Sequence, residues 1–303
     1  MAQPETVPLR TRSSNTRPVS ILITGVSGFL GSHVARLLTE EGRPFTGLYN
    51  LKKPNLPAEQ LDLFDREEAL EKLKEIQPGA ILHLAAASSP NWCELNPKES
   101  QIINVEAPIT LATYSREAGI PFIFTSTDLV FDGQNAPYEE DWAPSPICTY
   151  GMQKVAAEQG VLLTHPGATI VRLPLLYGWG RNFLREWVEK LKAGNPLPAF
   201  VDEYRTPAYV KDAAHGLLML LRLGATGYYH LGGPEPLSRF DMARRIAVAF
   251  GIDERLVQPG RQSDVAMPAP RPADVSLSSE KAFALGYHPL KIEDALKDVV
   301  NRI

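Results

Sequence analysis

The sequence predicts an α/β fold: a doubly wound parallel sheet with a smaller C-terminal lobe. Short apolar segments alternate with amphipathic segments up to about residue 175, which is typical of parallel strands connected by helices. A glycine-rich turn joins the first apolar segment to the first amphipathic one. After Pro174 the alternation breaks. We therefore expect a sheet domain over residues 20–175 and a lobe over 176–303, with 207–232 returning to the sheet domain.

The apolar and amphipathic segments locate the individual elements. The predicted strands are residues 20–24, 44–49, 59–61, 81–87, 121–126, 168–173 and 228–231. The predicted helices are residues 32–41, 65–76, 96–119, 150–163, 182–193, 210–223 and 238–251, with two more after the proline-rich stretch 268–272. Asp65, Asn96 and Ser238 are predicted helix caps, because their side chains can accept hydrogen bonds from the first turn.

Composition excludes several classes of protein. The net charge is −4 with no long basic block, so we expect no nucleic-acid partner. No apolar run reaches the roughly 18 residues of a membrane span, so no membrane partner is expected. The two cysteines, Cys93 and Cys148, fit neither a disulfide framework nor a metal site, and they favour a reduced, cytoplasmic compartment.

The first 19 residues form a separate segment of the sequence. They carry Arg10, Arg12 and Arg17 among serines, threonines and prolines. A disordered tail is the simplest prediction. A transit peptide is the alternative, and Glu5 argues against it.

The glycine-rich turn carries the first functional signal. Gly25, Gly28 and Gly31 follow the first predicted strand and open the first helix. Glycines allow the backbone to approach a pyrophosphate closely, and the helix N-terminus offers free N–H groups to it. The turn therefore predicts a dinucleotide site on a Rossmann-type sheet, with an ordinary tight turn as the alternative.

The end of the second strand bears on which dinucleotide binds. An NAD-preferring site usually places Asp or Glu here to bind the adenosine ribose, but this chain has Asn50, Leu51, Lys52 and Lys53. The two lysines could bind a 2′-phosphate. We predict that NADP(H) is preferred and NAD(H) is possible, unless the lysines are simply a solvated loop. Asp62, after the third strand, is predicted to contact adenine.

The fourth predicted strand ends in small residues. Ala85 and Ala86 would leave room for a cofactor, and His83 is expected to be a core residue. Residues 88–94 should form a loop at the carboxyl end of this strand, where ligands bind in such sheets. Cys93 in this loop is expected to be an ordinary buried thiol.

Tyr150 and Lys154 form the central reactive pair of the sequence. They are four residues apart and would share one face of a helix. A phenol has a pKa near 10, and an ammonium roughly 4 Å away favours its deprotonated form. At an effective dielectric of about 20 the attraction is at most ~4 kcal/mol, or about three pKa units before desolvation. Tyr150 could thus be a general acid near neutral pH.

Together these motifs resemble the extended short-chain dehydrogenase/reductase family over nearly the whole chain. The glycine turn, the residues 83–86, the residues 126–128 and the Tyr150–Lys154 pair follow the family's order and approximate spacing. Within that family, residues 126–133 and 271–277 resemble the dTDP-4-dehydrorhamnose reductases. Residues 205–212 resemble the related branch that contains the non-catalytic β subunit of methionine adenosyltransferase.

The resemblance implies roles for individual residues. Tyr150 would donate a proton to a carbonyl oxygen, Lys154 would lower the phenol's pKa and hold the nicotinamide ribose, and Thr127 would donate to the same oxygen. The implied cofactor residues are Gly25, Ser27, Gly28, Phe29, Leu30, Gly31, Asn50, Lys52, Lys53, Asp62, Leu63, Leu84, Ala85, Ala86, Asn104, Thr125, Tyr150, Lys154 and Pro174. The implied substrate residues are Ser88, Trp92, Thr127, Asp128, Tyr150 and Arg205. No metal site is implied.

Departures from the motifs of related enzymes narrow the set of reactions that the sequence predicts. Sugar-nucleotide 4,6-dehydratases carry Glu after Thr-Asp, whereas Leu129 here cannot move a proton, so dehydration is disfavoured. C4 epimerases remain open. Residues 178–200 match no sugar-binding pattern, and Arg181, Asn182 and Arg205 are candidates for a diphosphate contact or for surface charge.

We therefore predict an NADPH-dependent reductase of a keto group on a nucleotide-activated deoxysugar. A non-catalytic NADP-binding regulatory subunit, an epimerase and a reductase of another carbonyl are the alternatives. The expected partner is a small-molecule sugar nucleotide. A homodimer is the base-rate expectation for the assembly.

Overall fold

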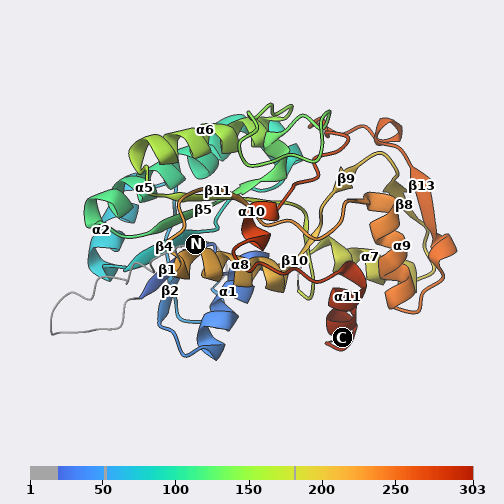
Figure 1. The fold of residues 1–303 in the computed structure, drawn as a ribbon, viewed down its shortest axis with the longest axis horizontal. Helices are drawn as coiled ribbons and strands as arrows, with labels where there is room; N and C mark the ends of the chain where they lie inside the picture. The colour runs from blue at the N-terminus through green and yellow to red at the C-terminus, as the bar shows by residue number, and fades with distance from the viewer. Residues whose placement is uncertain (1–19, 51–52, 181, 303) are drawn as a thin grey trace, which may run out of the picture.

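A seven-stranded parallel sheet forms the centre of the protein (Figure 1). The structure is a computed structural model that describes residues 20–50, 53–180 and 182–302. The predicted tail and Lys52 lie outside the described residues, as does Arg181. In sheet order the strands are β11 (Gly227–His230), β6 (Thr169–Leu173), β5 (Phe122–Thr127), β4 (Ala80–His83), β1 (Ile21–Thr24), β2 (Phe45–Tyr49) and β3 (Ala58–Gln60).

The strand order creates a crevice beside β1. From β1 the chain moves outward through β2 and β3, then crosses back to place β4 on the other side of β1. Such a switch of direction opens a crevice at the carboxyl ends of the strands. The buried Thr24 hydroxyl joins the two strand ends there: it lies 2.7 Å from His83 Nδ1 and accepts hydrogen bonds from the Leu84 and Ala85 amides. His83 is fully buried, as predicted.

Helices cover both faces of the sheet (Figure 1). One face carries α1 (Phe29–Glu40), α8 (Val210–Arg222) and α10 (Glu280–Phe283). The other carries α2 (Arg66–Ile76), α5 (Ala107–Ala118) and α6 (Thr149–Thr164). The doubly wound parallel sheet predicted from the sequence is confirmed.

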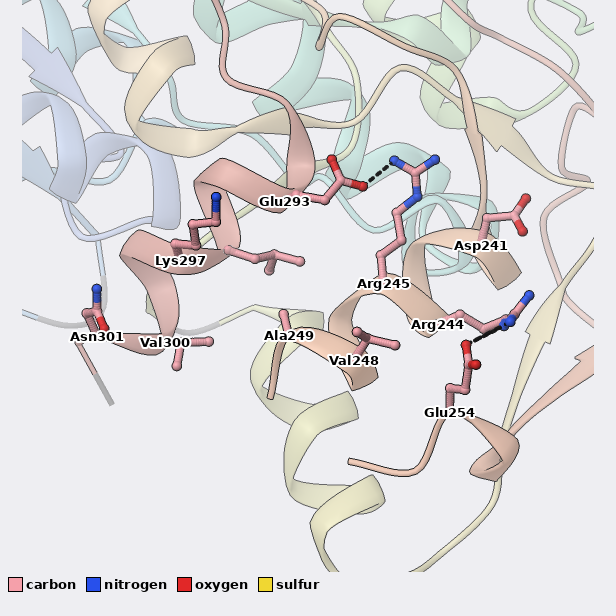
Figure 2. A pocket seen from close by; sticks show the side chains of 11 residues that line it. Asp241, Arg244, Arg245, Val248, Ala249, Glu254, Glu293, Lys297, Val300 and Asn301 are labelled. Atoms are coloured by element: carbon pink, nitrogen blue, oxygen red, sulfur yellow. Dashed lines mark hydrogen bonds and ion pairs between the residues drawn. The ribbon is translucent and has the colours of Figure 1, made fainter. Parts of the chain in front are cut away.

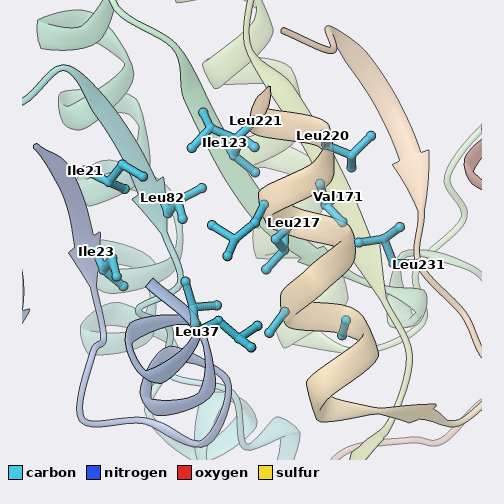
Figure 3. Close-up of a cluster of buried hydrophobic side chains, with 14 of the residues drawn as sticks. Ile21, Ile23, Leu37, Leu82, Ile123, Val171, Leu217, Leu220, Leu221 and Leu231 are labelled. Carbon is cyan, nitrogen blue, oxygen red and sulfur yellow. The ribbon is translucent and has the colours of Figure 1, made fainter. Parts of the chain in front are cut away.

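The core lies between the sheet and these helices. On one face, Ile23 of β1 and Leu82 of β4 belong to the same buried cluster as Leu37 of α1 and Leu217 of α8 (Figure 3). A second buried cluster fills the opposite face beneath α2, α5 and α6. Burying one such aliphatic side chain contributes roughly 1.5–3 kcal/mol, so these layers fix the positions of the strand ends.

The connection between β4 and α5 differs in detail from the prediction. Part of the expected loop 88–94 is a helix, α3 (Pro90–Leu95), capped by Ser89. The next helix continues without a break through α4 (Pro97–Gln101), a π-helical turn (Ile102–Glu106) and α5. Asn96 precedes α4, but its predicted capping role is wrong, because its amide donates to the Trp92 carbonyl instead.

A lobe of short strands and helices lies beside the carboxyl end of the sheet (Figure 1). It contains α7 (Phe183–Lys192), β8 (Leu197–Phe200), β9 (Tyr204–Arg205), β12 (Leu237–Ser238), α9 (Arg239–Ala249), β13 (Val257–Gly260) and α11 (Ile292–Val300). A small pair, β7 (Leu176–Tyr177) with β10 (Ala208–Tyr209), connects it to the sheet. Between β10 and β12 in the sequence, α8 and β11 belong to the sheet layer, where β11 pairs parallel with β6. In the described part of the chain, no helix is long and apolar enough to cross a membrane.

A buried ion pair fixes the sheet beneath α6. Arg172 of β6 and Glu158 of α6 form two hydrogen bonds of 2.9 and 3.0 Å, and their side chains are 1% and 0% exposed. The Arg172 guanidinium also lies over the ring of Tyr228 and donates to the Glu140 carbonyl. The pair thereby links β6, β11, α6 and the segment that leads into α6.

We expect Glu158→Gln to lower the free energy of unfolding by about 3–5 kcal/mol, because it leaves the Arg172 charge buried without a counter-ion. Urea unfolding followed by circular dichroism measures the change. Glu189→Gln is the matched control, since its pair with Arg185 has side chains 63% and 62% exposed and should change stability by about 1 kcal/mol or less. Equal, small effects of both substitutions would contradict this account.

Candidate active site

A single cavity of about 1000 Å³ runs from the crevice beside β1 to the lobe. It collects most of the residues predicted from the sequence. Those lining it are Gly25, Ser27, Gly28, Phe29, Leu30, Gly31, Asn50, Asp62, Leu63, Leu84, Ala85, Ala86, Ser88, Thr125, Thr127, Asp128, Tyr150, Lys154, Pro174 and Arg205. Among the described residues predicted for the site, Lys53, Trp92, Asn104 and the diphosphate candidate Asn182 are not in its lining.

The glycine turn forms one end of the cavity. Gly25 has φ +68°, and a Cβ there would lie 2.8 Å from the Ala85 nitrogen, so the turn and β4 could not approach as they do. A Cβ on Gly31 would lie 2.2 Å from the Gly25 carbonyl oxygen. The N-cap of α1 is Gly28, which offers no capping side chain, and the first turn contains no acidic residue. The helix N-terminus is thus suited to an external anion.

The end of β2 carries no carboxylate. Asn50 lines the cavity, and its amide donates to Asp62 at 3.3 Å while its carbonyl accepts from Gln60. Both Asn50 and Asp62 line the cavity, and their contacts with an adenosine stay a prediction. The described Lys53 is exposed and lies outside the cavity lining, so the structure does not place it at a 2′-phosphate.

Asn104 supports the site from behind the cavity wall. It is buried, and its side chain both accepts from the Ala87 amide (2.9 Å) and donates to the Ala87 carbonyl (3.1 Å). It also donates to Gln153, which lies between Tyr150 and Lys154 in the sequence. The structure therefore shows no direct cofactor position for Asn104. Its side chain instead joins the segment after β4 to α6.

Tyr150 and Lys154 lie in the first two turns of α6 and line the cavity. Gly151 allows this position, because a Cβ there would lie 2.2 Å from the Leu129 carbonyl oxygen. Tyr150 is 7% exposed and Lys154 is 1% exposed. Lys154 Nζ lies 4.2 Å from the centre of the Phe124 ring. The predicted shared helix face is therefore present.

Burial controls the protonation of this pair. It raises the pKa of Tyr150 above its ordinary value of 10 and lowers the pKa of Lys154 to about 7. Desolvation is the largest effect on the phenol in this arrangement, and the predicted effect of Lys154 on the pKa of Tyr150 stays a prediction. Tyr150 therefore keeps the proton that a general acid must donate.

Thr127, Asp128 and Arg205 connect the sheet to the lobe. The Thr127 hydroxyl donates to Asp128 Oδ1 at 3.1 Å, so it must rotate before it can donate to a ligand. Arg205 of β9 donates to the same oxygen at 2.7 Å. Asp128 Oδ2 and Arg205 Nε are buried and have no hydrogen-bond partner among the described residues. Buried polar atoms of this kind beside a cavity suit a polar ligand.

The lobe adds charged residues that the sequence did not reveal. Glu203, Arg239 and Arg271 line the cavity together with Arg205. Arg239 also stacks over Phe183 and Trp187, with 4.7 Å from its guanidinium carbon to each ring centre. The proline-rich stretch 268–272 was the available signal for Arg271. Nothing local marks Glu203 or Arg239, because their approach depends on pairing in the lobe.

A second cavity of about 740 Å³ lies on the lobe between α9 and α11 (Figure 2). Both arginines of its lining form ion pairs within it: Arg244 pairs with Glu254, and Arg245 with Glu293, each at 2.7 Å. Among the described residues, none of those predicted for the site lines it. The cavity beside β1 is therefore the candidate active site. In the described part of the chain, no cluster of three or more His, Cys, Asp or Glu residues could hold a metal ion.

Comparison with known proteins agrees with this geometry. A family model described as RmlD substrate binding domain matches residues 19–303. The chain belongs to this family. A curated relative, "Probable low-salt glycan biosynthesis reductase Agl14" of Haloferax volcanii, is 34% identical over 284 residues, covering 90% of this chain and 95% of the relative.

Two further matches are a curated relative and a solved structure. Methionine adenosyltransferase 2 subunit beta of Xenopus tropicalis is 32% identical over 277 residues, covering 88% of this chain and 82% of the relative. The crystal structure of dTDP-4-dehydrorhamnose reductase from Bacillus anthracis in complex with NADP has a TM-score of 0.86 at 25% identity, covering 95% of this chain and 100% of that one. The predicted family resemblance is confirmed by these matches.

We expect Lys154→Met to raise the free energy of unfolding at pH 7, and the gain to shrink as the pH rises. The folded-state pKa of Lys154 is about 7, against an ordinary value of 10.5. Between these values the unfolded chain holds a proton that the folded chain has lost, so wild-type stability rises with pH. The gain should be on the order of a few kcal/mol at pH 7 and close to zero near pH 10.5.

Urea unfolding of both proteins from pH 6 to pH 10 measures this difference. Lys98→Met, on the exposed surface of α4, controls for the loss of one ammonium group. A gain in stability that stays constant across the range would show that burial does not depress the Lys154 pKa.

Proposed function

We propose that the protein is an NADPH-dependent reductase of a keto group on a nucleotide-activated deoxysugar, similar to dTDP-4-dehydrorhamnose reductase. One observation carries the proposal: Thr127, Tyr150 and Lys154 line the same cavity as the glycine turn and an arginine cluster of the lobe. A dinucleotide and a nucleoside diphosphate sugar would meet at these three residues.

The glycine-turn end fits a dinucleotide. The uncapped N-terminus of α1 suits a pyrophosphate, and Ala85 and Ala86 leave space beside it. A bound nicotinamide would supply the hydride. NADP(H) is favoured because β2 is followed by Asn50 rather than a carboxylate, and the solved relative from Bacillus anthracis binds NADP. NAD(H) remains the weaker choice.

The protein's own residues would then perform the proton chemistry. Tyr150 is protonated at neutral pH and donates its proton to the carbonyl oxygen as that oxygen gains negative charge. Lys154 lies one helical turn further along the same face, where it can bind the ribose and compensate the charge left on the phenolate. Thr127 supplies a second donor after its hydroxyl rotates away from Asp128.

The residue after Asp128 argues against elimination of water from the sugar. Leu129 is 5% exposed and packs in the apolar cluster around Tyr150. A hydrocarbon side chain there cannot remove a proton from a sugar carbon. The site therefore supports reduction rather than dehydration.

A regulatory role is the second candidate function. The observation that favours it is the 32% identity to methionine adenosyltransferase 2 subunit beta across 88% of the chain. In this case the cavity would bind NADP(H) without turnover, and the chain would bind to a partner enzyme. Copurification with that enzyme, together with no oxidation of NADPH by any keto sugar, would favour this candidate.

We expect Tyr150→Phe to lower kcat by about 10²- to 10⁴-fold, because it removes the proton donor. NADPH binding, measured by fluorescence, should change little. Tyr114→Phe is the matched control: its hydroxyl donates to the Leu73 carbonyl outside the cavity lining, and turnover should be kept. Full activity of Tyr150→Phe would exclude Tyr150 as the acid.

A further inference from the structure

The arginines at the lobe end of the cavity come from three neighbouring backbone segments. β9 pairs antiparallel with β12, which places the start of α9 beside it. On its other side, the Tyr204 amide donates to the Ala273 carbonyl at 2.7 Å. Arg205, Arg239 and Arg271 therefore converge on one end of the cavity although they lie far apart in the sequence.

The Glu203 carboxylate lies inside this arginine cluster. Its Oε1 is 3.4 Å from Arg205 Nη2, and its backbone carbonyl accepts from the Arg239 amide at 3.0 Å. Burial lowers the pKa of Arg239 to about 10 and also lowers that of Arg271, while the Glu203 charge opposes both shifts. The negative charge of Glu203 therefore interacts with all three guanidinium groups.

Asp128 and Glu203 are both carboxylates that contact Arg205, but they lie on different sides of it. Asp128 lies at the carboxyl end of β5 and binds Arg205 at 2.7 Å. Glu203 instead lies on the lobe side, where it is 7% exposed as a residue and lines the cavity. A ligand anion that reaches Arg239 and Arg271 therefore comes close to the Glu203 carboxylate.

We propose that Glu203 is a specificity-determining residue that makes the anion site prefer a diphosphate diester over a free nucleoside diphosphate. The proposal rests on the proposed function, since it takes the arginine cluster as the diphosphate site. Each phosphate of a diester carries one negative charge, whereas a terminal phosphate gains a further charge above pH ~6. In a partly buried site, Glu203 repels this additional charge more strongly than bulk water would allow.

The consequence is a site that resists blockage by free nucleotide. Three guanidinium groups alone would bind the more highly charged ligand more tightly. Glu203 cancels the tighter binding of the free nucleoside diphosphate. An intact sugar nucleotide can then compete with it for the site. If Glu203 only held the arginines in place, its removal would affect both kinds of ligand equally.

The test compares two ligands that differ by one charge. dTDP and its terminal methyl ester share the base, the deoxyribose and the diphosphate, and neither contains a second sugar ring. Calorimetry at pH 8 with saturating NADP⁺ gives both dissociation constants for the wild type, Glu203→Gln and Glu235→Gln. Glu235 is the matched control, because it pairs with Arg245 on the lobe outside the cavity lining.

We expect the wild type and Glu235→Gln to bind the ester at least as tightly as dTDP. In Glu203→Gln, the affinity for dTDP should rise about threefold or more relative to the ester, the factor that like charges several ångströms apart give even in a water-like dielectric. An unchanged ratio would overturn the proposal. Should Glu203→Gln not fold, wild-type protein that prefers dTDP to the ester overturns it as well.

The failure of the proposed function would look different. If neither ligand binds to the wild type while NADP⁺ does, the arginine cluster is not a thymidine diphosphate site, and the dTDP-sugar substrate and the role of Glu203 fall together. If both ligands bind but Glu203→Gln leaves their ratio unchanged, only the role of Glu203 falls.

Discussion

The candidate site depends on the ion pair between Asp128 and Arg205. Asp128 directly follows strand β5, and Arg205 belongs to β9 of the lobe, so their 2.7 Å contact joins the two parts of the protein at the cavity. The glycine turn and the arginine cluster line this same cavity. Because the pair is buried, its attraction is weakly screened, but both groups are also desolvated. The free Asp128 Oδ2 and Arg205 Nε show that this desolvation is not fully compensated within the described residues.

The reactive residues Tyr150 and Lys154 are also buried and desolvated. Lys154 is buried against the Phe124 ring. Its lowered pKa shows that burial of the charged amine in the cavity is energetically unfavourable. Tyr150 is buried beside it and holds its proton more strongly than a phenol in water. Both features suit a site that receives a carbonyl compound and transfers a proton to it. They are hard to explain as contributions to stability.

Local sequence patterns predicted the sheet domain well, because its strands, its glycine turn and the Tyr150–Lys154 spacing are encoded over a few residues each. The lobe was harder. Its two-residue strands β9 and β12 leave no periodic signal, yet their pairing is what brings Glu203 and Arg239 to the cavity. The protonation of Tyr150 was also beyond local reasoning, since it is set by burial, which depends on Leu129 and Ala269 from distant segments. The capping role expected of Asn96 failed for a similar reason: α3 places the Trp92 carbonyl within its reach.

The most direct test of the account is the loss of NADPH absorbance with enzymatically prepared dTDP-4-keto-6-deoxyglucose, with and without the matching 3,5-epimerase, and with NADH for comparison. We expect rapid, NADPH-selective loss that requires the epimerase. Loss without the epimerase would keep the reductase chemistry but assign a different sugar. No loss under any condition, with NADPH binding intact, would contradict the central claim that the cavity reduces a sugar-nucleotide carbonyl.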